Sequence, residues 1–202
     1  GMRIASDVGS SWNSAGGNGN DGIGGGIANM LQESYHSQYF NNVLWQNDPD
    51  VIFLRDHNIQ LSDIEIESLA LWSGFLGSAI TTSDFTDELR EDRLEILHFI
   101  RPGETRVTVR IPSFTADDGL YVAVRSYQHG DAILLFNTRA AQRDFDLEPS
   151  TLLNKPTPLA WSWPISGKPL VQDPVRLEGT LGPHASRLFW FSAHPPPATL
   201  NP

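Results

Sequence analysis

The sequence is most informative at first for what it lacks. It has no cysteine among 202 residues, which excludes disulfide bonds and thiolate metal sites. Only two lysines occur and the arginines are scattered, so there is no basic stripe for a nucleic-acid backbone. No apolar run reaches membrane-spanning length. With 40% hydrophobic residues and a net charge of −10, we expect a soluble, cytoplasmic protein without nucleic-acid or membrane partners.

The first half alternates short apolar runs with segments of helical periodicity. The apolar runs predict strands, and the segments between them carry apolar residues at helical spacing. Ser62 followed by Glu65 forms a capping box that opens the second helix. Strand followed by helix, three times over, predicts parallel βαβ units. The expected strands are 2–8, 51–54 and 79–82, and the expected helices are 23–39, 62–76 and 87–100.

In the second half the period changes from helical to alternating. Short alternating runs separated by turn residues predict an antiparallel β-sandwich. We therefore place a boundary between a domain at 1–102 and a second at 103–202, and we expect the proline-rich tail 195–202 to lie on the surface. Trp161 and Trp163 are expected to pack in or beside the second core. The expected strands are 105–111, 120–127, 132–137, 175–181 and 187–191.

Acidic residues follow or flank each expected parallel strand. Asp7 lies at the end of the first, Asp48 and Asp50 stand at the entry of the second, and Asp84 follows the third. Parallel sheets place ligand sites at the carboxyl ends of their strands, which favours a site there. Structural alternatives stay open: an Asx turn or an ion pair with Arg3 for Asp7, a solvated turn for Asp48 and Asp50, and a helix N-cap for Asp84.

Two further features argue against other chemistries. The Gly/Asn-rich segment 14–26 lacks the Gly-Lys-Ser/Thr ending of a phosphate-binding P-loop, so we interpret it as a surface or active-site loop. The six histidines show no metal-ligand spacing. We therefore expect no metal and no cofactor.

Several motifs occur in the order that one enzyme family has. The strongest is Trp45-Gln46-Asn47-Asp48-Pro49-Asp50, which resembles the W-x-N-D-P-D signature of α-galactosidases (melibiases) of glycoside hydrolase family 36 and the related family 27. Around it stand weaker matches, which are Arg3-Ile4-Ala5-Ser6-Asp7-Val8 with Trp12, Leu69 to Gly74 with Ser83-Asp84, and Gly182 to Arg187.

The resemblance implies both a fold and a set of roles. The chain would be the last three βα units of a (β/α)8 (TIM) barrel followed by the C-terminal β-sandwich, and its ligand would be an α-galactoside or related carbohydrate. Asp7 would be the catalytic acid/base. The residues matching the substrate pocket are Arg3, Trp12, Trp45, Asn47, Asp48, Asp50 and Asp84.

One departure from the family pattern limits the expected activity. Family members carry a nucleophilic aspartate two strands before the acid/base, and this sequence starts at the acid/base strand. A retaining glycosidase needs two carboxyl groups roughly 5 Å apart. We therefore expect a fragment that is inactive alone and works with a missing N-terminal half or as a homodimer of half-barrels. The alternative is a non-catalytic carbohydrate-binding or interaction module.

Overall fold

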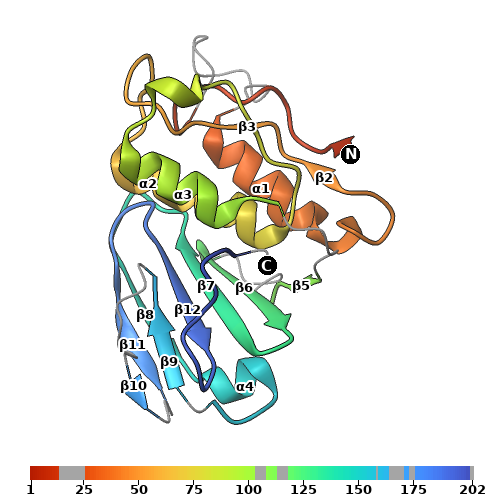
Figure 1. The fold of residues 1–202 in the computed structure, drawn as a ribbon, viewed down its shortest axis with the longest axis vertical. Helices are drawn as coiled ribbons and strands as arrows, with labels where there is room; N and C mark the ends of the chain where they lie inside the picture. The colour runs from red at the N-terminus through yellow and green to blue at the C-terminus, as the bar shows by residue number, and fades with distance from the viewer. Residues whose placement is uncertain are drawn as a thin grey trace. The chain divides into compact units, whose positions relative to one another are not determined.

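The computed structural model describes residues 1–13, 26–102, 108–112, 118–157, 159–163, 171–172 and 176–200 (Figure 1). The chain forms two compact units. The first comprises Gly1–Thr108 with Thr199 and Leu200, and the second comprises Val109–Ala198. The glycine-rich segment interpreted as a loop lies outside the described residues except for Gly26, as do the starts of the strands expected at 105–111 and 175–181.

The first unit alternates strands and helices, as the periodicity predicts, except that an unpredicted strand at Asn47–Asp48 precedes the one expected at 51–54. Its strands pair in parallel, β1 with β2 and β3 with β4, which confirms the predicted direction. Each strand has only two residues, so the expected strands of four to seven residues were too long. The elements are β1 (Met2–Arg3), α1 (Ile27–Ser37), η1 (Gln38–Phe40), β2 (Asn47–Asp48), β3 (Val51–Ile52), α2 (Asp63–Leu76), β4 (Thr81–Thr82), η2 (Thr86–Glu88) and α3 (Glu91–Ile100).

Helix α2 is the best-defined element of this unit. The Ser62 hydroxyl accepts the backbone N–H of Glu65, and the Glu65 carboxylate accepts that of Ser62, so the predicted capping box is confirmed. Gly77 ends the helix with φ 67°, a conformation that favours glycine. A Cβ at Gly74 would stand 2.6 Å from the Cβ of Ile100, so the glycine lets α3 pack closely against α2.

The second unit is built from two antiparallel sheets. The larger has the order β10-β9-β12-β7-β6-β5, and the smaller pairs β11 with β8. One apolar cluster joins them, with Val124, Ile133 and Phe189 from the larger sheet and Phe145 and Leu177 from the smaller. The elements are β5 (Val109–Arg110), β6 (Leu120–Tyr127), β7 (Gly130–Asn137), β8 (Arg143–Leu147), α4 (Pro149–Leu153), β9 (Leu159–Ser162), β10 (Val171–Gln172), β11 (Leu177–Leu181) and β12 (Ser186–Phe191).

Two parts of this picture depart from the sequence prediction. Strand β9 was not among the expected strands, although its Trp161 is buried as expected and donates its indole N–H to the carbonyl of Ser192. The tail is not wholly superficial: Leu200 is fully buried and its N–H binds the Phe99 carbonyl at 2.7 Å. Three prolines prevent strand pairing but do not prevent the apolar residue after them from packing. In the described part of the chain, no helix has the length and apolarity to cross a membrane.

Candidate functional site

Arg3 joins two of the expected site carboxylates. Its Nη2 lies 3.0 Å from Oδ1 of Asp7 and 2.6 Å from Oδ2 of Asp50. Its Nε binds the Ala5 carbonyl at 3.1 Å, which fixes the guanidinium in the turn that follows β1. The structure therefore brings Arg3, Asp7 and Asp50 together, although 42 or more residues separate Asp50 from the other two in the sequence.

Asp50 follows β2, and its side chain joins that strand to β1 and to the segment after it. Its φ of 80° breaks the strand between β2 and β3, and its own N–H binds Oδ1 of Asp48 at 3.0 Å. Its Oδ2 also accepts the backbone N–H of Val8 at 2.7 Å. Asp48 thus forms the turn that was one of the open alternatives, and it places the Asp50 carboxylate between the segment after β1 and Arg3.

Asp7 differs from Asp50 in its access to solvent. The Asp7 side chain is fully exposed, whereas that of Asp50 is 14% exposed. Both carboxylates contact the same guanidinium nitrogen, but that of Asp50 is largely buried and that of Asp7 faces solvent. The ion pair that was one alternative for Asp7 is therefore present.

Asp84 has a different environment, because its two oxygens are already bound by the protein. Oδ2 accepts the N–H of Leu54 at 2.6 Å and the hydroxyl of Thr82 at 2.7 Å, and Oδ1 accepts a guanidinium N–H of Arg55 at 2.9 Å. The side chain has 0% exposure. Asp84 also does not cap the following helix, since the N-cap of η2 is Phe85. It joins β4 to the segment after β3.

The aromatic and amide residues of the expected pocket are placed elsewhere. Asn47 is fully buried; its Nδ2 donates to the Ser37 carbonyl, and its Oδ1 accepts the indole N–H of Trp45. Trp45 precedes β2 and so stands at the amino end of the parallel pair, whereas Asp7 follows the carboxyl end of β1. Trp12 is buried, and its carbonyl accepts the N–H of Ala28 in α1. The side-chain hydrogen bonds of Asn47 and Trp45 are thus with each other and with Ser37, away from the Arg3 cluster.

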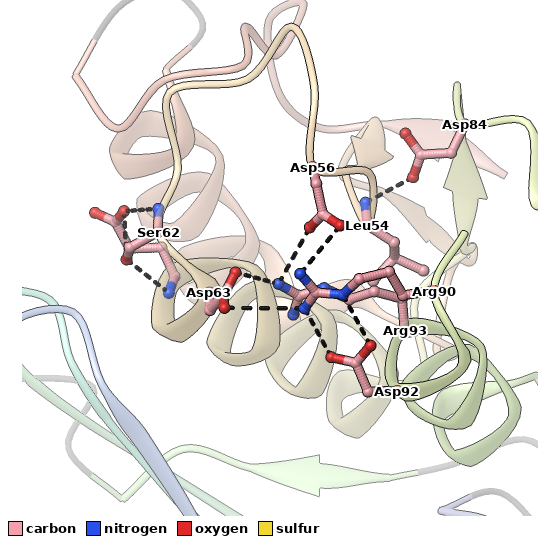
Figure 2. A network of polar contacts seen from close by, with 9 residues as sticks. Leu54, Asp56, Ser62, Asp63, Asp84, Arg90, Asp92 and Arg93 are labelled. Carbon is pink, nitrogen blue, oxygen red and sulfur yellow. Dashed lines mark hydrogen bonds and ion pairs between the residues drawn. The ribbon is translucent and has the colours of Figure 1, made fainter. Parts of the chain in front are cut away.

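A second polar cluster lies beside Asp84 and was not expected from the sequence (Figure 2). Arg93 is buried, and its Nη2 lies 2.5 Å from Oδ1 of Asp63 and 3.7 Å from Oδ1 of Asp56. Arg90 binds Asp56 at 3.1 Å and Asp92 at 2.8 Å. The hydrogen bond from Arg90 lowers the pKa of the Asp92 carboxyl from its ordinary value. These contacts tie the loop after β3 to the starts of α2 and α3.

Only half of this cluster is visible in the sequence. Arg90 and Arg93 stand three residues apart at the start of a helix, a spacing that places both on one face. Which acids they meet depends on the fold, because Asp56 and Asp63 come from a different loop and helix. Among the described residues, no group of three or more histidine, aspartate or glutamate side chains is arranged to hold a metal ion.

The fold is similar to that of solved α-galactosidases. No family model matches the sequence, and a search of curated proteins finds no match. Structural neighbours include a Bacteroides fragilis protein assigned as an α-galactosidase (18% identity, TM-score 0.73), α-galactosidase I of Mortierella vinacea (13%, 0.70) and α-galactosidase of Saccharomyces cerevisiae (13%, 0.66). They cover 94%, 96% and 96% of this chain.

These similarities define a class and a limit. The chain has an α-galactosidase-like glycoside hydrolase fold, with a β/α unit followed by an antiparallel unit. It spans 42%, 54% and 59% of the lengths of the three neighbours. At such identities the similarity shows a shared fold and does not transfer the roles of the neighbours' residues to this chain.

Proposed function

We propose that the chain is the acid/base-bearing part of an α-galactosidase-type glycoside hydrolase. In this proposal the first unit is the last three βα units of a (β/α)8 barrel, and the second unit is the β-sandwich that follows it. One observation carries the proposal: Arg3 holds the exposed Asp7 and the sheltered Asp50 together at the carboxyl end of β1. Carboxyl ends of parallel strands are where barrels of this class bind substrate.

Each member of the cluster has a defined task. Asp7, being exposed, protonates the leaving oxygen of the glycosidic bond and then activates water. The carboxylate of Asp50 and the guanidinium of Arg3 supply an acceptor and donors for sugar hydroxyls. Asp48 keeps Asp50 in its turn, whereas the side chains of Asn47 and Asp84 are taken up by contacts within the protein and do not touch the sugar.

Turnover requires a second carboxylate, which attacks the anomeric carbon. Asp50 is a poor nucleophile in this position, because its Oδ2 is bound by both Arg3 and the Val8 N–H. We therefore propose that the nucleophile comes from outside the residues of this chain. Accordingly, the chain on its own binds galactosides and does not hydrolyse them.

Galactose binding tests the proposal directly. Amide resonances of the isotopically labelled chain are followed by NMR during titration with D-galactose and, separately, D-glucose. We expect galactose to shift the resonances of Arg3, Asp7 and Val8 and glucose to shift them less. Asp7→Asn and Arg3→Gln weaken the galactose response at least several-fold, and the exposed Asp87→Asn serves as the control. Absence of any galactose response in a folded chain contradicts the proposal.

The second candidate is a non-catalytic carbohydrate-binding module, and one observation favours it. Two of the expected pocket residues, Asn47 and Asp84, are occupied by contacts within the protein. A cationic iminosugar related to galactose separates the candidates, because an acid/base site built to stabilise positive charge binds it far more tightly than galactose. Equal affinities favour the module. Hydrolysis of p-nitrophenyl-α-galactoside that Asp7→Asn abolishes excludes the module and also contradicts the proposal that the chain alone is inactive.

A further inference from the structure

A second surface of the first unit is strongly apolar. The loop between α1 and β2, orange in Figure 1, exposes three large side chains: Tyr39 is 78%, Val43 71% and Leu44 64% exposed. Phe40, which is 38% exposed, stacks on Trp45, with ring centroids 5.3 Å apart and planes 27° apart. We call Tyr39, Phe40, Val43, Leu44 and Trp45 the aromatic loop. It precedes β2, so it lies at the opposite strand end from Asp7.

The loop is held in one conformation. Asn41 donates from its Nδ2 to the Leu76 carbonyl at 2.8 Å, which anchors the loop to the end of α2. Within the loop, the N–H of Asn42 binds the Trp45 carbonyl at 2.7 Å. The N–H groups of Val43 and Leu44 both bind the Phe40 carbonyl. Binding through a surface that is already ordered costs little conformational entropy.

Charge distinguishes among partners for this surface. Residues 38–46, with the sequence QYFNNVLWQ, carry no charge in a chain whose net charge is −10. A two-fold contact places the same surface of both copies together, so a surface with charges of one sign would repel its copy. An uncharged apolar loop is therefore the place where two copies of this acidic chain can meet without repulsion.

The size of the surface is also consistent with a contact between two copies of the chain. Its exposed side chains offer roughly 500 Å² of apolar area, near the upper end for a single protein. Two copies facing each other bury roughly 1,000 Å², about the lower limit of a specific interface. From this charge-free, ordered and apolar surface we infer that the aromatic loop docks onto the aromatic loop of a second copy of this chain. The dimer is weak, with a dissociation constant in the micromolar range or above.

Sedimentation of the full chain at increasing concentration tests the inference. We expect a reversible monomer–dimer equilibrium. In the double variant Val43→Glu/Leu44→Glu, four carboxylates meet across the contact, and the dissociation constant rises at least tenfold. The matched control is Phe85→Glu, which adds a charge at an exposed aromatic residue (70% exposed) outside the loop and leaves association unchanged.

Three results overturn the inference. A wild-type chain that stays monomeric at every concentration excludes a second copy as the partner. A dimer unaffected by Val43→Glu/Leu44→Glu moves the contact to another surface, such as the edge of β1. Loss of the dimer in Phe85→Glu does the same. Circular dichroism confirms that each variant is folded, and Tyr39→Lys replaces the double variant if that one unfolds. The galactose response at Asp7 is unchanged in the loop variants, which separates this inference from the proposed function.

Discussion

The two units of the chain are stabilised in different ways. In the second unit, backbone ladders of up to eight residue pairs and one apolar cluster define the structure. In the first, strands are two residues long, and carboxylates and amides bind backbone N–H and carbonyl groups between segments. A sheet held by backbone hydrogen bonds tolerates many substitutions, whereas a sheet whose segments are joined by side chains depends on particular residues. The candidate site lies in the first unit, where side chains join the segments.

The largest effect is expected in the apolar cluster of the second unit. Phe189 is almost fully buried there, and its ring lies 6.0 Å from that of Phe145. Phe189→Ala should lower the free energy of unfolding by about 3–5 kcal/mol, because it removes buried area and leaves a cavity. Native-state hydrogen exchange, read at amides of β6 and β7, measures the loss. The exposed Phe85→Ala is the control, and equal losses in the two variants would contradict the packing.

A somewhat smaller loss should follow from a single carboxylate in the first unit. Asp84→Ala removes the acceptor of the Leu54 N–H, the Thr82 hydroxyl and Arg55 together. Buried groups that lose a charged partner cost about 2–4 kcal/mol. Urea denaturation followed in the first unit measures this loss, with Asp87→Ala as the exposed control. If Asp84→Ala is neutral, side chains do not hold this unit together.

Next comes the capping box of α2. Ser62→Ala removes the acceptor for the Glu65 N–H, and we expect a loss of about 1 kcal/mol. Hydrogen exchange of amides in the first turn of α2 reports the change locally. Ser62→Asn is the matched variant, since asparagine also caps helices, and it should restore most of the stability. A variant series in which alanine and asparagine behave alike would count against the cap.

The smallest effect should come from Asp92, which is more than half exposed. The hydrogen bond from Arg90 lowers the pKa of the Asp92 carboxyl in the folded chain. Ionised Asp92 therefore stabilises the folded chain at pH values above 3.8, the ordinary pKa of an aspartate. That contribution is lost as the pH falls through the lowered pKa. Asp92→Asn should therefore be slightly less stable than the wild type near neutral pH and equal to it in strong acid. Urea midpoints of the two chains, measured from neutral pH to strong acid, test this. A stability difference that grows as the pH falls would contradict the prediction.

Local signals in the sequence predicted much of the fold. The alternation in 120–127 gave β6 with its observed bounds, and Ser62 with Glu65 gave the start of α2. The strands of the first unit are shorter than expected, and β2 was not expected at all; the positive φ of Asp50, which separates β2 from β3, depends on Asp48 and on Val8 from the segment after β1. No local pattern contains that arrangement.

The candidate site was also predictable only in part, because some of its contacts are local in sequence and others depend on the fold. The grouping of Arg3, Asp7 and Asp50 follows from acids and an arginine at successive strand ends. The burial of Asn47 does not, because it depends on the Ser37 carbonyl and on the Asn41 side chain, which the fold brings close. The position of Trp45 depends on strand register, which places it at the amino end of the pair.

Asp50 combines two requirements that other residues meet only singly. Glycine would adopt φ 80° at least as readily, yet it offers no anion to Arg3 or to the Val8 amide. Glutamate would keep the charge and resist the bend. A chain with glycine in place of Asp50 would therefore keep the backbone bend and lose the side-chain contacts that join β2 to the segment after β1.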